Sequence, residues 1–534
     1  MENFITKIID KDLSINPSLE IKTRFPPEPN GYLHIGHVKS IWLNNELAVQ
    51  YNGKCNLRFD DTNPVKEDIE FINSIKDDIA WLGYDTSSNI HYASDYFEQF
   101  FEYAVRLIKM GKAYIDHQSP DEIAKTRGTL TESGIESPCR DRPIEESFSD
   151  FIKMRQGKFP ERACCLRAKI DMSSSFLVLR DPVIYRIKYA HHHQTGDKWC
   201  IYPMYDFAHC LSDYIENISH SLCSLEFQDN RRLYDWVLDE LGLSQPVRPR
   251  QYEFSRLNFD DVVLSKRKLT KLVEEKHVSG WSDPKMPTVS GLRNRGFTPS
   301  SIKEFISQAG ITKQNYFVSF SLLENVLRKE LETNATRALA VINPLKVVIT
   351  NLDGDYVETL QCSNHPKQEM GHRDVAFSNE IYIDKNDFKL VANKKFKRLI
   401  FGGEVRLRGA YVMKANDYKM DLNGDISMIY CTIDKETLGK NTSDGRKVKG
   451  VIHWVCAKNN APVIFRLFNK VFNTDGLVAN DATEEVAGYV ESSVVESDMR
   501  VHYQFERVGY FIQSVDNPTI YNGVITLRES FSKD

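Results

Sequence analysis

The stretch RFPPEPNGYLHIGH, residues Arg24–His37, places a rigid proline-rich turn directly before the motif HxGH. The motif falls where a helix is expected to begin, and the N–H groups of a helix N-terminus favour phosphate. Gly36 leaves room for a nucleotide against the backbone, while His34 and His37 can donate hydrogen bonds to phosphoryl oxygens. On their own, such histidines are more often a helix cap or core residues. As a group, they suit a site at which the α-phosphate of ATP is attacked.

A second element lies far downstream, in Val263–Arg267 (VLSKR). Lys266 is expected on a flexible loop, where an ammonium group can stabilise the charge that develops as pyrophosphate leaves. HxGH followed by a loop that contains Ser-Lys resembles the signature pair of the class I aminoacyl-tRNA synthetases. Leu264 departs from the pattern, since the class favours methionine there, but leucine preserves the apolar anchor.

Within that class, the chain most resembles the glutaminyl-tRNA synthetase family, over nearly its whole length. This resemblance implies an ATP-dependent ligase that joins glutamine to the 3′ end of tRNA(Gln) through a glutaminyl-adenylate and releases AMP and diphosphate. It also implies that activation requires bound tRNA. Besides Arg24–His37, the stretches that carry it are Asn56–Asp68, Trp199–Phe207, Cys223–Trp236, Arg250–Leu257 and Lys447–Val455.

The apolar pattern predicts alternating strands and helices in the first third of the chain. A strand is expected at Cys55–Phe59, one helix at Ile72–Leu82, and another at Phe100–Ile108 that ends at Gly111. This alternation indicates a multidomain α/β plus β protein whose catalytic part contains a parallel sheet.

Two later regions differ in pattern. Between about Ser119 and Pro203 the sequence is irregular, with strand-like runs at Leu166–Asp171 and Phe176–Leu179, as in an inserted domain. Beyond Ala335, short strands and turn signals such as Asp353–Gly354 and Asn423–Gly424 indicate β-barrels. With the resemblance, the expected domains are a Rossmann-like catalytic domain (1–100 and 205–256), an inserted acceptor-stem-binding domain (101–204), a helical subdomain (257–334) and two anticodon-binding β-barrels (335–534).

Composition adds limits on class and compartment. The 534 residues carry a net charge of −5, no apolar run long enough for a membrane helix, and first ten residues unlike a secretory signal. The ten cysteines form no CxxC pair, which fits reduced thiols in the cytoplasm. Cys362 and His365 have no second ligand pair, so no metal site is predicted. The run His191–His193 is predicted to lie at the surface, and the basic clusters Ser265–Lys271 and Lys394–Arg408 are solvated faces unless they contact nucleic acid.

For the ATP site, the resemblance implies that His34, His37 and Lys266 are catalytic. Because the substrate carboxylate attacks ATP itself, no protein nucleophile is needed. Mg²⁺ would be bound mainly through the phosphates. Glu28 resembles a residue that faces the terminal ribose, although a structural salt bridge is an alternative. The other residues assigned to ATP are Pro29, Asn30, Gly36, Arg256, Leu257 and Ser265.

For the amino acid, the resemblance implies that Asp60 pairs with the α-ammonium group, the alternative being a turn cap. Arg24 and Tyr205 would form the side-chain pocket, with Cys223 and Gln251 nearby. A tyrosine hydroxyl can accept from the carboxamide NH₂ while arginine donates to its carbonyl, which would separate glutamine from glutamate. Without the family, Tyr205 would be assigned to the core.

For tRNA, Leu130 matches an apolar wedge that replaces base stacking, although an exposed turn leucine would look the same. Asp229 matches a carboxylate that accepts from a guanine amino group, the alternative being an ion pair with Arg231 or Arg232. Lys395 stands where the family often has glutamine, which leaves one anticodon contact open. The positions matched to anticodon recognition are Arg337, Lys397, Arg398, Arg406, Gln504 and Arg507.

Two alternatives remain from the sequence. A glutamyl-tRNA synthetase with the same kind of barrels would share the ATP motifs, and Tyr205 argues against it. A non-catalytic tRNA-binding paralogue is the other, against which the intact His34, His37 and Lys266 argue. The expected state is a monomer.

Overall fold

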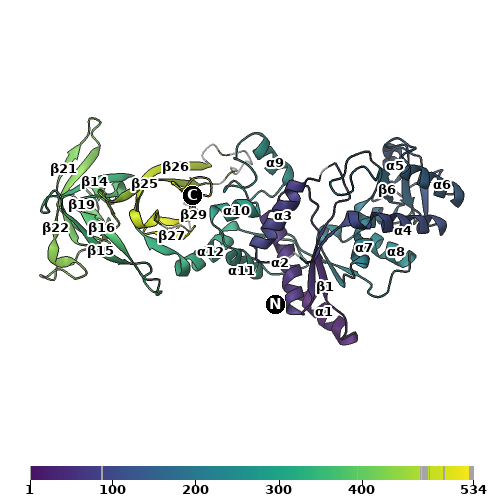
Figure 1. Ribbon diagram of the computed structural model, residues 1–534, viewed down its shortest axis with the longest axis horizontal. Coiled ribbons are helices and arrows are strands. Elements are labelled where there is room, and N and C mark those ends of the chain that lie inside the picture. The colour runs from purple at the N-terminus through teal and green to yellow at the C-terminus, as the bar shows by residue number, and fades with distance from the viewer. Residues whose placement is uncertain are drawn as a thin grey trace. The chain divides into compact units, whose positions relative to one another are not determined.

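The computed structural model describes residues 2–65, 67–85, 88–393, 395–469, 471, 479, 482–496 and 500–527. Lys394, which begins the second basic cluster, lies outside these residues. The chain divides into two compact units, Met1–Asp260 with Ile306–Val318 and Asp261–Phe305 with Ser319–Asp534 (Figure 1).

Parallel strands organise the first unit, as the alternating pattern predicts. The parallel strands are β1 (Lys22–Phe25), β2 (Lys54–Phe59), β3 (Ile90–Tyr92), β8 (His220–Ser224) and β9 (Arg250–Phe254). Ser219 N donates to Lys22 O at 3.0 Å, so β8 begins beside β1. The helices of this part are α1 (Phe4–Ile15), α2 (Ile35–Gln50), α3 (Ile69–Trp81), α7 (Tyr205–Ile215) and α8 (Arg231–Glu240). The helix expected at Ile72–Leu82 is therefore confirmed as α3, and the strand at Cys55–Phe59 as β2.

An antiparallel four-stranded sheet lies within the same unit. Its strands, in spatial order, are β4 (Ala113–Asp116), β5 (Cys165–Ala168), β6 (Val183–Ile187) and β7 (Ile201–Pro203), accompanied by α4 (Phe97–Lys109), α5 (Pro120–Thr126) and α6 (Ile144–Arg155). Phe101 of α4 stacks on Phe151 of α6 with ring centroids 4.8 Å apart. The core of this sheet continues through Phe207 and Leu233, so α7 and α8 pack against it.

The predicted strand at Phe176–Leu179 is wrong. Leu177–Leu179 form a 3₁₀ turn, in which Leu179 N donates to Phe176 O and Arg180 N donates to Leu177 O. These short-range bonds use the backbone groups that a strand would offer to a neighbour.

Helices begin the second unit, and the rest of it is mainly β-structure. The helices are α9 (Lys266–Glu274), α10 (Val289–Arg295), α11 (Pro299–Ala309, which ends in the first unit) and α12 (Phe320–Asn334). Strands β10 (Leu257–Phe259) and β11 (Tyr316–Val318), which pair in parallel, belong to the first unit.

Two barrel-like seven-stranded sheets follow. We call them the proximal and the distal sheet by their order along the chain, since the proximal sheet is complete before most strands of the distal sheet begin. The proximal sheet runs β23 (Val451–Ile452), β20 (Glu404–Leu407), β21 (Val412–Met420), β22 (Ile426–Asp434), β14 (Pro344–Ile349), β17 (Glu380–Asp384) and β24 (Val455–Cys456). The distal sheet runs β12 (Thr336–Ala338), β27 (His502–Phe505), β28 (Gly509–Gln513), β29 (Ile520–Ile525), β25 (Asn460–Phe468), β26 (Thr483–Glu491) and β13 (Ala340–Val341). The proximal sheet is thus a continuous insertion between β13 and β25.

Only one of the two predicted hairpins is confirmed. Asn423–Gly424 joins β21 to β22, which pair antiparallel. Asp353–Gly354 leads from β14 to β15 (Val357–Ser363), and these strands do not pair with each other. Both edges of β14 are taken by β17 and β22, so β15 pairs instead with β16 (His372–Ser378). None of the described helices is both long enough and apolar enough to cross a membrane.

Candidate functional site

The HxGH motif forms the N-terminus of α2, as expected. Gly36 N donates to Nδ1 of His34 at 3.1 Å, and His34 N donates to Nδ1 of His37 at 3.1 Å. The two rings stack with centroids 3.8 Å apart, and burial lowers the pKa of His34 to about 4. Because each Nδ1 accepts a hydrogen bond, a neutral ring carries its proton on Nε2, the tautomer that can donate to a phosphate.

The proline-rich turn before α2 is tied to the loop that follows β2. Asp60 N donates to Pro27 O at 3.0 Å, and Asp68 N donates to Pro29 O at 3.2 Å. Within the turn, Asn30 N donates to Glu28 O at 2.8 Å. The structure thus brings Glu28, Pro29 and Asn30 beside the loop of Asp60. Of the remaining residues matched to ATP in the first unit, Leu257 is buried in β10 and Arg256 pairs with Glu226 at 2.9 Å.

Lys266 is the first residue of α9, with Ser265 as the N-cap residue. Both belong to the second unit, whereas His34 and His37 belong to the first. Their cooperation around one triphosphate therefore stays a prediction.

Asp60, at the start of the loop that follows β2, is an unusual ionisable residue. Its carboxylate oxygens are both buried, and no group of the described residues donates a hydrogen bond to either. Burial raises the pKa of Asp60 to about 6, despite the nearby guanidinium of Arg58. A buried carboxylate without donors is costly to maintain, so such a group calls for a cationic or hydrogen-bonding ligand.

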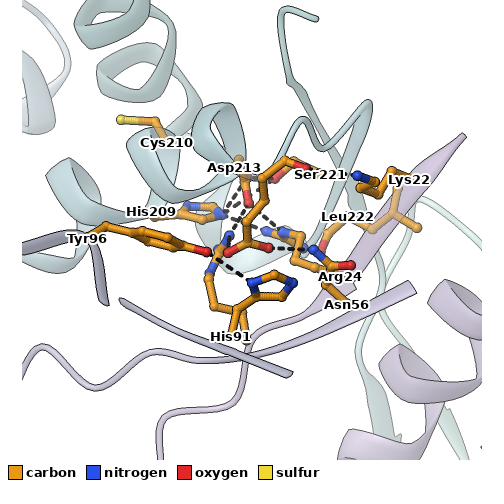
Figure 2. Close-up of polar contacts among 12 residues, drawn as sticks. Lys22, Arg24, Asn56, His91, Tyr96, His209, Cys210, Asp213, Ser221 and Leu222 are labelled. Carbon is orange, nitrogen blue, oxygen red and sulfur yellow. Dashed lines mark hydrogen bonds and ion pairs between the residues drawn. The ribbon is translucent and has the colours of Figure 1, made fainter. Parts of the chain in front are cut away.

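Arg24 is fully buried at the centre of a charged cluster (Figure 2). Its Nε donates to Asp213 Oδ1 at 2.9 Å, and its Nη1 donates to Leu222 O at 2.8 Å. Its Nη2 contacts His209 Nε2 at 2.6 Å and Cys223 Sγ at 3.5 Å. Four of the five N–H groups of Arg24 are therefore directed at protein atoms, which fixes the orientation of the guanidinium.

Asp213 holds this cluster together, although no motif in the sequence predicts this role. It lies on α7 and accepts from Arg24, from Arg58 Nη1 at 2.7 Å, from Ser221 Oγ at 2.6 Å and from Tyr234 at 3.0 Å. Burial alone would raise its pKa, but the two guanidinium groups hold it well below the usual value for aspartate. These partners are far apart in sequence, so a local motif search misses them.

The other residues predicted for the amino acid lie around the same cluster. Tyr205 begins α7 and stacks on His209 with ring centroids 5.1 Å apart; burial raises the pKa of its hydroxyl well above the usual value. Gln251 is buried in β9, where its Nε2 donates to Phe227 O at 2.9 Å and to Glu253 at 3.1 Å. The structure thus brings Arg24, Tyr205 and Cys223 together through His209, which the sequence analysis also missed.

The surface prediction for His191–His193 is wrong for two of the three residues. His191 is 72% exposed, but the side chain of His192 is fully buried and that of His193 is 9% exposed. Ligand-type atoms of Asp61, His192 and His193 lie within 4.8 Å of one another. His192 Nε2 faces Asp61 O at 2.8 Å, while its Nδ1 accepts from Gln194 N and Thr195 N. This is the geometry of a hydrogen-bond network, because both ring nitrogens of His192 already have protein partners.

Leu130 lies in the loop between α5 and α6 and is 78% exposed. Arg180 fixes this loop: its Nη1 donates to the carbonyl oxygens of Arg127, Thr129 and Glu132 at 2.7 to 3.0 Å. A rigid loop with an exposed apolar tip is suited to act as a wedge.

Asp229 is exposed in the turn before α8. Its arginine neighbours contact other groups: Arg231 pairs with Glu253 at 3.2 Å, and the guanidinium of Arg232 lies 3.5 Å from the ring centre of Phe176. Both arginines thus have other partners, and within the described part of the chain the alternative of an ion pair with Asp229 has no support.

The residues predicted to read the anticodon lie in the two barrel-like sheets and their turns. Arg507 forms a bidentate pair with Asp387, at 2.6 and 2.8 Å, and thereby ties the distal sheet to the proximal one. Arg398 also contacts Asp387, at 3.2 Å. Arg337 and Arg406 donate to backbone carbonyls, Lys395 and Lys397 are exposed, and Gln504 Oε1 is buried without a donor among the described residues.

Comparisons with known proteins cover both units. A family model described as tRNA synthetases class I (E and Q), catalytic domain, matches residues 20–333, and two models described as anti-codon binding domains of that class match residues 335–434 and 451–514. A glutamine–tRNA ligase from Vibrio cholerae serotype O1 is 56% identical, with 99% of this chain and 98% of the relative covered. One from Haemophilus influenzae is 55% identical, covering 99% and 97%. A solved glutamate tRNA ligase from Elizabethkingia meningosepticum gives a TM-score of 0.44 at 17% identity, covering 59% of this chain and 70% of that one.

Proposed function

The chain belongs to the class I tRNA synthetases for glutamate and glutamine, and we propose that within this family it joins glutamine to tRNA(Gln) in an ATP-dependent reaction. The observation that carries the assignment of its site is the buried carboxylate of Asp60, which has no donor among the described residues and lies at the end of a parallel strand beside the HxGH turn. Ligands of parallel α/β sheets bind at this end of the strands.

Asp60 is the ligand of the substrate α-ammonium group. An ammonium supplies the donors that the carboxylate lacks and favours its ionised form. The bound glutamine then presents its own carboxylate to the α-phosphate of ATP, next to the N-terminus of α2. No group of the protein needs to be acylated.

His34 and His37 bind the triphosphate. Their Nε2–H groups donate to phosphoryl oxygens, and their Nδ1 atoms are held by backbone N–H groups at 3.1 Å, which fixes this tautomer. Lys266 stabilises the negative charge on the departing diphosphate. Mg²⁺ arrives with ATP as part of the substrate. The turn of Glu28, Pro29 and Asn30, with Gly36, Arg256, Leu257 and Ser265, completes the nucleotide site.

Recognition of the glutamine side chain depends on Arg24 and Tyr205. The described residues account for four of the five N–H groups of Arg24, and the fifth, on Nη1, donates to the carboxamide oxygen. Tyr205, whose hydroxyl stays neutral because burial raises its pKa, accepts from the carboxamide NH₂. Glutamate offers no donor at that place and would leave the hydroxyl unmatched, a difference of about 1–3 kcal/mol. Cys223 and Gln251 also line the pocket for the glutamine side chain.

Binding of tRNA uses both units. Leu130 acts as the wedge at the first base pair and Asp229 contacts the acceptor stem, while Arg337, Lys397, Arg398, Arg406, Gln504 and Arg507 bind the anticodon. The arginines among them now contact protein oxygens and would exchange these for nucleotide groups. The enzyme works as a monomer in the cytoplasm.

The test is charging of tRNA(Gln) with glutamine and glutamate side by side, together with ATP–pyrophosphate exchange in the presence of tRNA. We expect glutamine to be preferred. Lys266→Ala should lower exchange by ~100-fold or more while tRNA binding is retained. Lys271→Ala, on the same helix and paired only at the surface with Glu275, is the matched control and should behave as wild type. Preferential charging with glutamate would refute the substrate, and normal exchange by Lys266→Ala would refute the catalytic role.

A further inference from the structure

Asp61, the residue after the proposed ammonium ligand, is held by hydrogen bonds with Ser94 and His193. It is fully buried. Its Oδ1 accepts from Ser94 N at 2.8 Å, and its Oδ2 accepts from Ser94 Oγ at 2.6 Å. His193 Nε2 contacts the same Oδ2 at 2.9 Å.

The backbone of Asp61 is held as well. His192 Nε2 donates to Asp61 O at 2.8 Å, and two backbone N–H groups, of Gln194 and Thr195, donate to its Nδ1 at 3.1 and 3.2 Å. Two successive histidines from the inserted region therefore hold the side chain and the carbonyl group of one residue that lies far away in sequence.

Asp60 itself is placed differently. Its carboxylate has no donor among the described residues, and its backbone N–H donates to Pro27 O at 3.0 Å. No hydrogen bond from the described residues fixes the direction of this carboxylate, so its direction depends on the backbone on both sides. On one side this backbone is the proline-rich turn, and on the other side it is Asp61.

We propose that Ser94 and His193 are positioning residues for amino acid binding: they hold Asp61, and through its backbone they hold the Asp60 carboxylate in the place where the substrate ammonium binds. This inference rests on the proposed function, in which Asp60 is the ammonium ligand. His193 does not touch the substrate. Its removal should therefore weaken amino acid binding without removing any group that takes part in the chemistry.

The experiment is steady-state aminoacylation by the full-length His193→Ala enzyme. The KM for glutamine should rise roughly tenfold, the size expected for loss of one hydrogen bond to a charged group. The kcat at saturating glutamine and the KM for ATP should stay within about twofold of wild type.

Two further variants separate positioning from a general loss of structure. His193→Gln retains an N–H donor and should bring the KM for glutamine back to within about threefold of wild type. Ser94→Ala removes the Oγ donor but retains the backbone N–H group, so it should raise the same KM by a few-fold even if the His193→Ala protein does not fold. His191→Ala is the matched control, because this neighbouring histidine is 72% exposed and pairs with the exposed Asp197.

An unchanged KM for glutamine in both His193→Ala and Ser94→Ala would overturn the proposal. Equal increases in the KM values for glutamine and ATP would also overturn it, as would a His193→Gln enzyme whose KM for glutamine is as high as that of His193→Ala. Failure of the proposed function looks different. If the wild-type enzyme charges glutamate, the substrate is wrong, but the KM for glutamate still tests His193, since both amino acids carry the same ammonium group. If Asp60→Asn leaves that KM unchanged, the role of Asp60 is wrong.

Discussion

At the scale of single residues, Asp60 joins two properties that oppose each other. Its burial disfavours the charged form, and its proposed task requires that form. With its pKa raised to about 6, Asp60 is mostly ionised at neutral pH and becomes protonated as the pH falls through that value. A bound ammonium shifts the balance further toward the carboxylate.

A pH dependence follows from this. Below pH 6 the protonated Asp60 cannot pair with an ammonium, so kcat/KM for glutamine should fall, approaching tenfold per pH unit. The measurement is kcat/KM for glutamine from pH 5 to pH 8 at saturating ATP and tRNA. Asp60→Asn should have a low value without this slope. A wild-type profile that is flat between pH 5 and pH 7, or an Asp60→Asn profile with the same slope, would contradict the assignment.

Single residues of the site also differ in whether the sequence alone can locate them. His34, His37 and Asp60 lie in short motifs, so their roles can be predicted from the residues next to them in the sequence. Asp213, His209 and His192 act through partners far away along the chain. Neither Asp213 nor His209 lies in a recognisable motif, and the histidine run that contains His192 does not show which residue it will contact. Such residues become recognisable only when folding brings α7 or the inserted region against β1 and β2.

At the scale of elements, hydrophobic periodicity predicts most accurately where one face of an element is buried. The helices α3 and α4 were expected from their apolar spacing, and Gly111, with a φ of +69°, ends the turn after α4 as expected. The strand predicted at Phe176–Leu179 and the hairpin predicted at Asp353–Gly354 are wrong, because an apolar run and a turn signal do not reveal which partner an element will have. Pairing in a sheet is decided by competition among strands.

The loop that carries Leu130 gives a prediction at this scale. Because Arg180 holds the loop by three carbonyl groups, Leu130 can stack against a base without further ordering. Leu130→Ala should lower kcat/KM for tRNA roughly tenfold, the size of one lost stacking contact, and leave ATP and glutamine KM values unchanged.

Ile135→Ala is the matched control for Leu130→Ala. It removes a side chain of similar size that is 67% exposed near the same loop. Aminoacylation measured over a range of tRNA concentrations provides the comparison. Equal effects of the two substitutions would mean that Leu130 acts only as a surface residue.

At the scale of the whole molecule, the two barrel-like sheets have different relations to the chain. Every strand of the proximal sheet comes from residues 344–456, and its core is mostly local. The distal sheet takes β12 and β13 from before this insertion and its other strands from after it.

Separate folding of the proximal sheet is therefore expected. A fragment of residues 342–458 should give a β-type circular dichroism spectrum, a cooperative thermal transition and resistance to limited proteolysis. A fragment that begins at residue 459 lacks both β12 and β13 and should aggregate, because β26 and β27 each lose one neighbouring strand and become sheet edges. A disordered 342–458 fragment, or a stable monomer from residue 459 onward, would contradict this reading of the topology.

The placement of β12 and β13 also matters while the chain is being made. Both strands leave the ribosome before the proximal sheet, and β12 must wait for β27, near the C-terminus, before its backbone groups are paired. During that interval an unpaired strand is open to any other extended segment, including one from a second nascent chain on the same message. Early completion of the proximal sheet reduces this hazard, because it draws the two ends of the insertion together and so brings β13 close to the chain that will form β26, its partner.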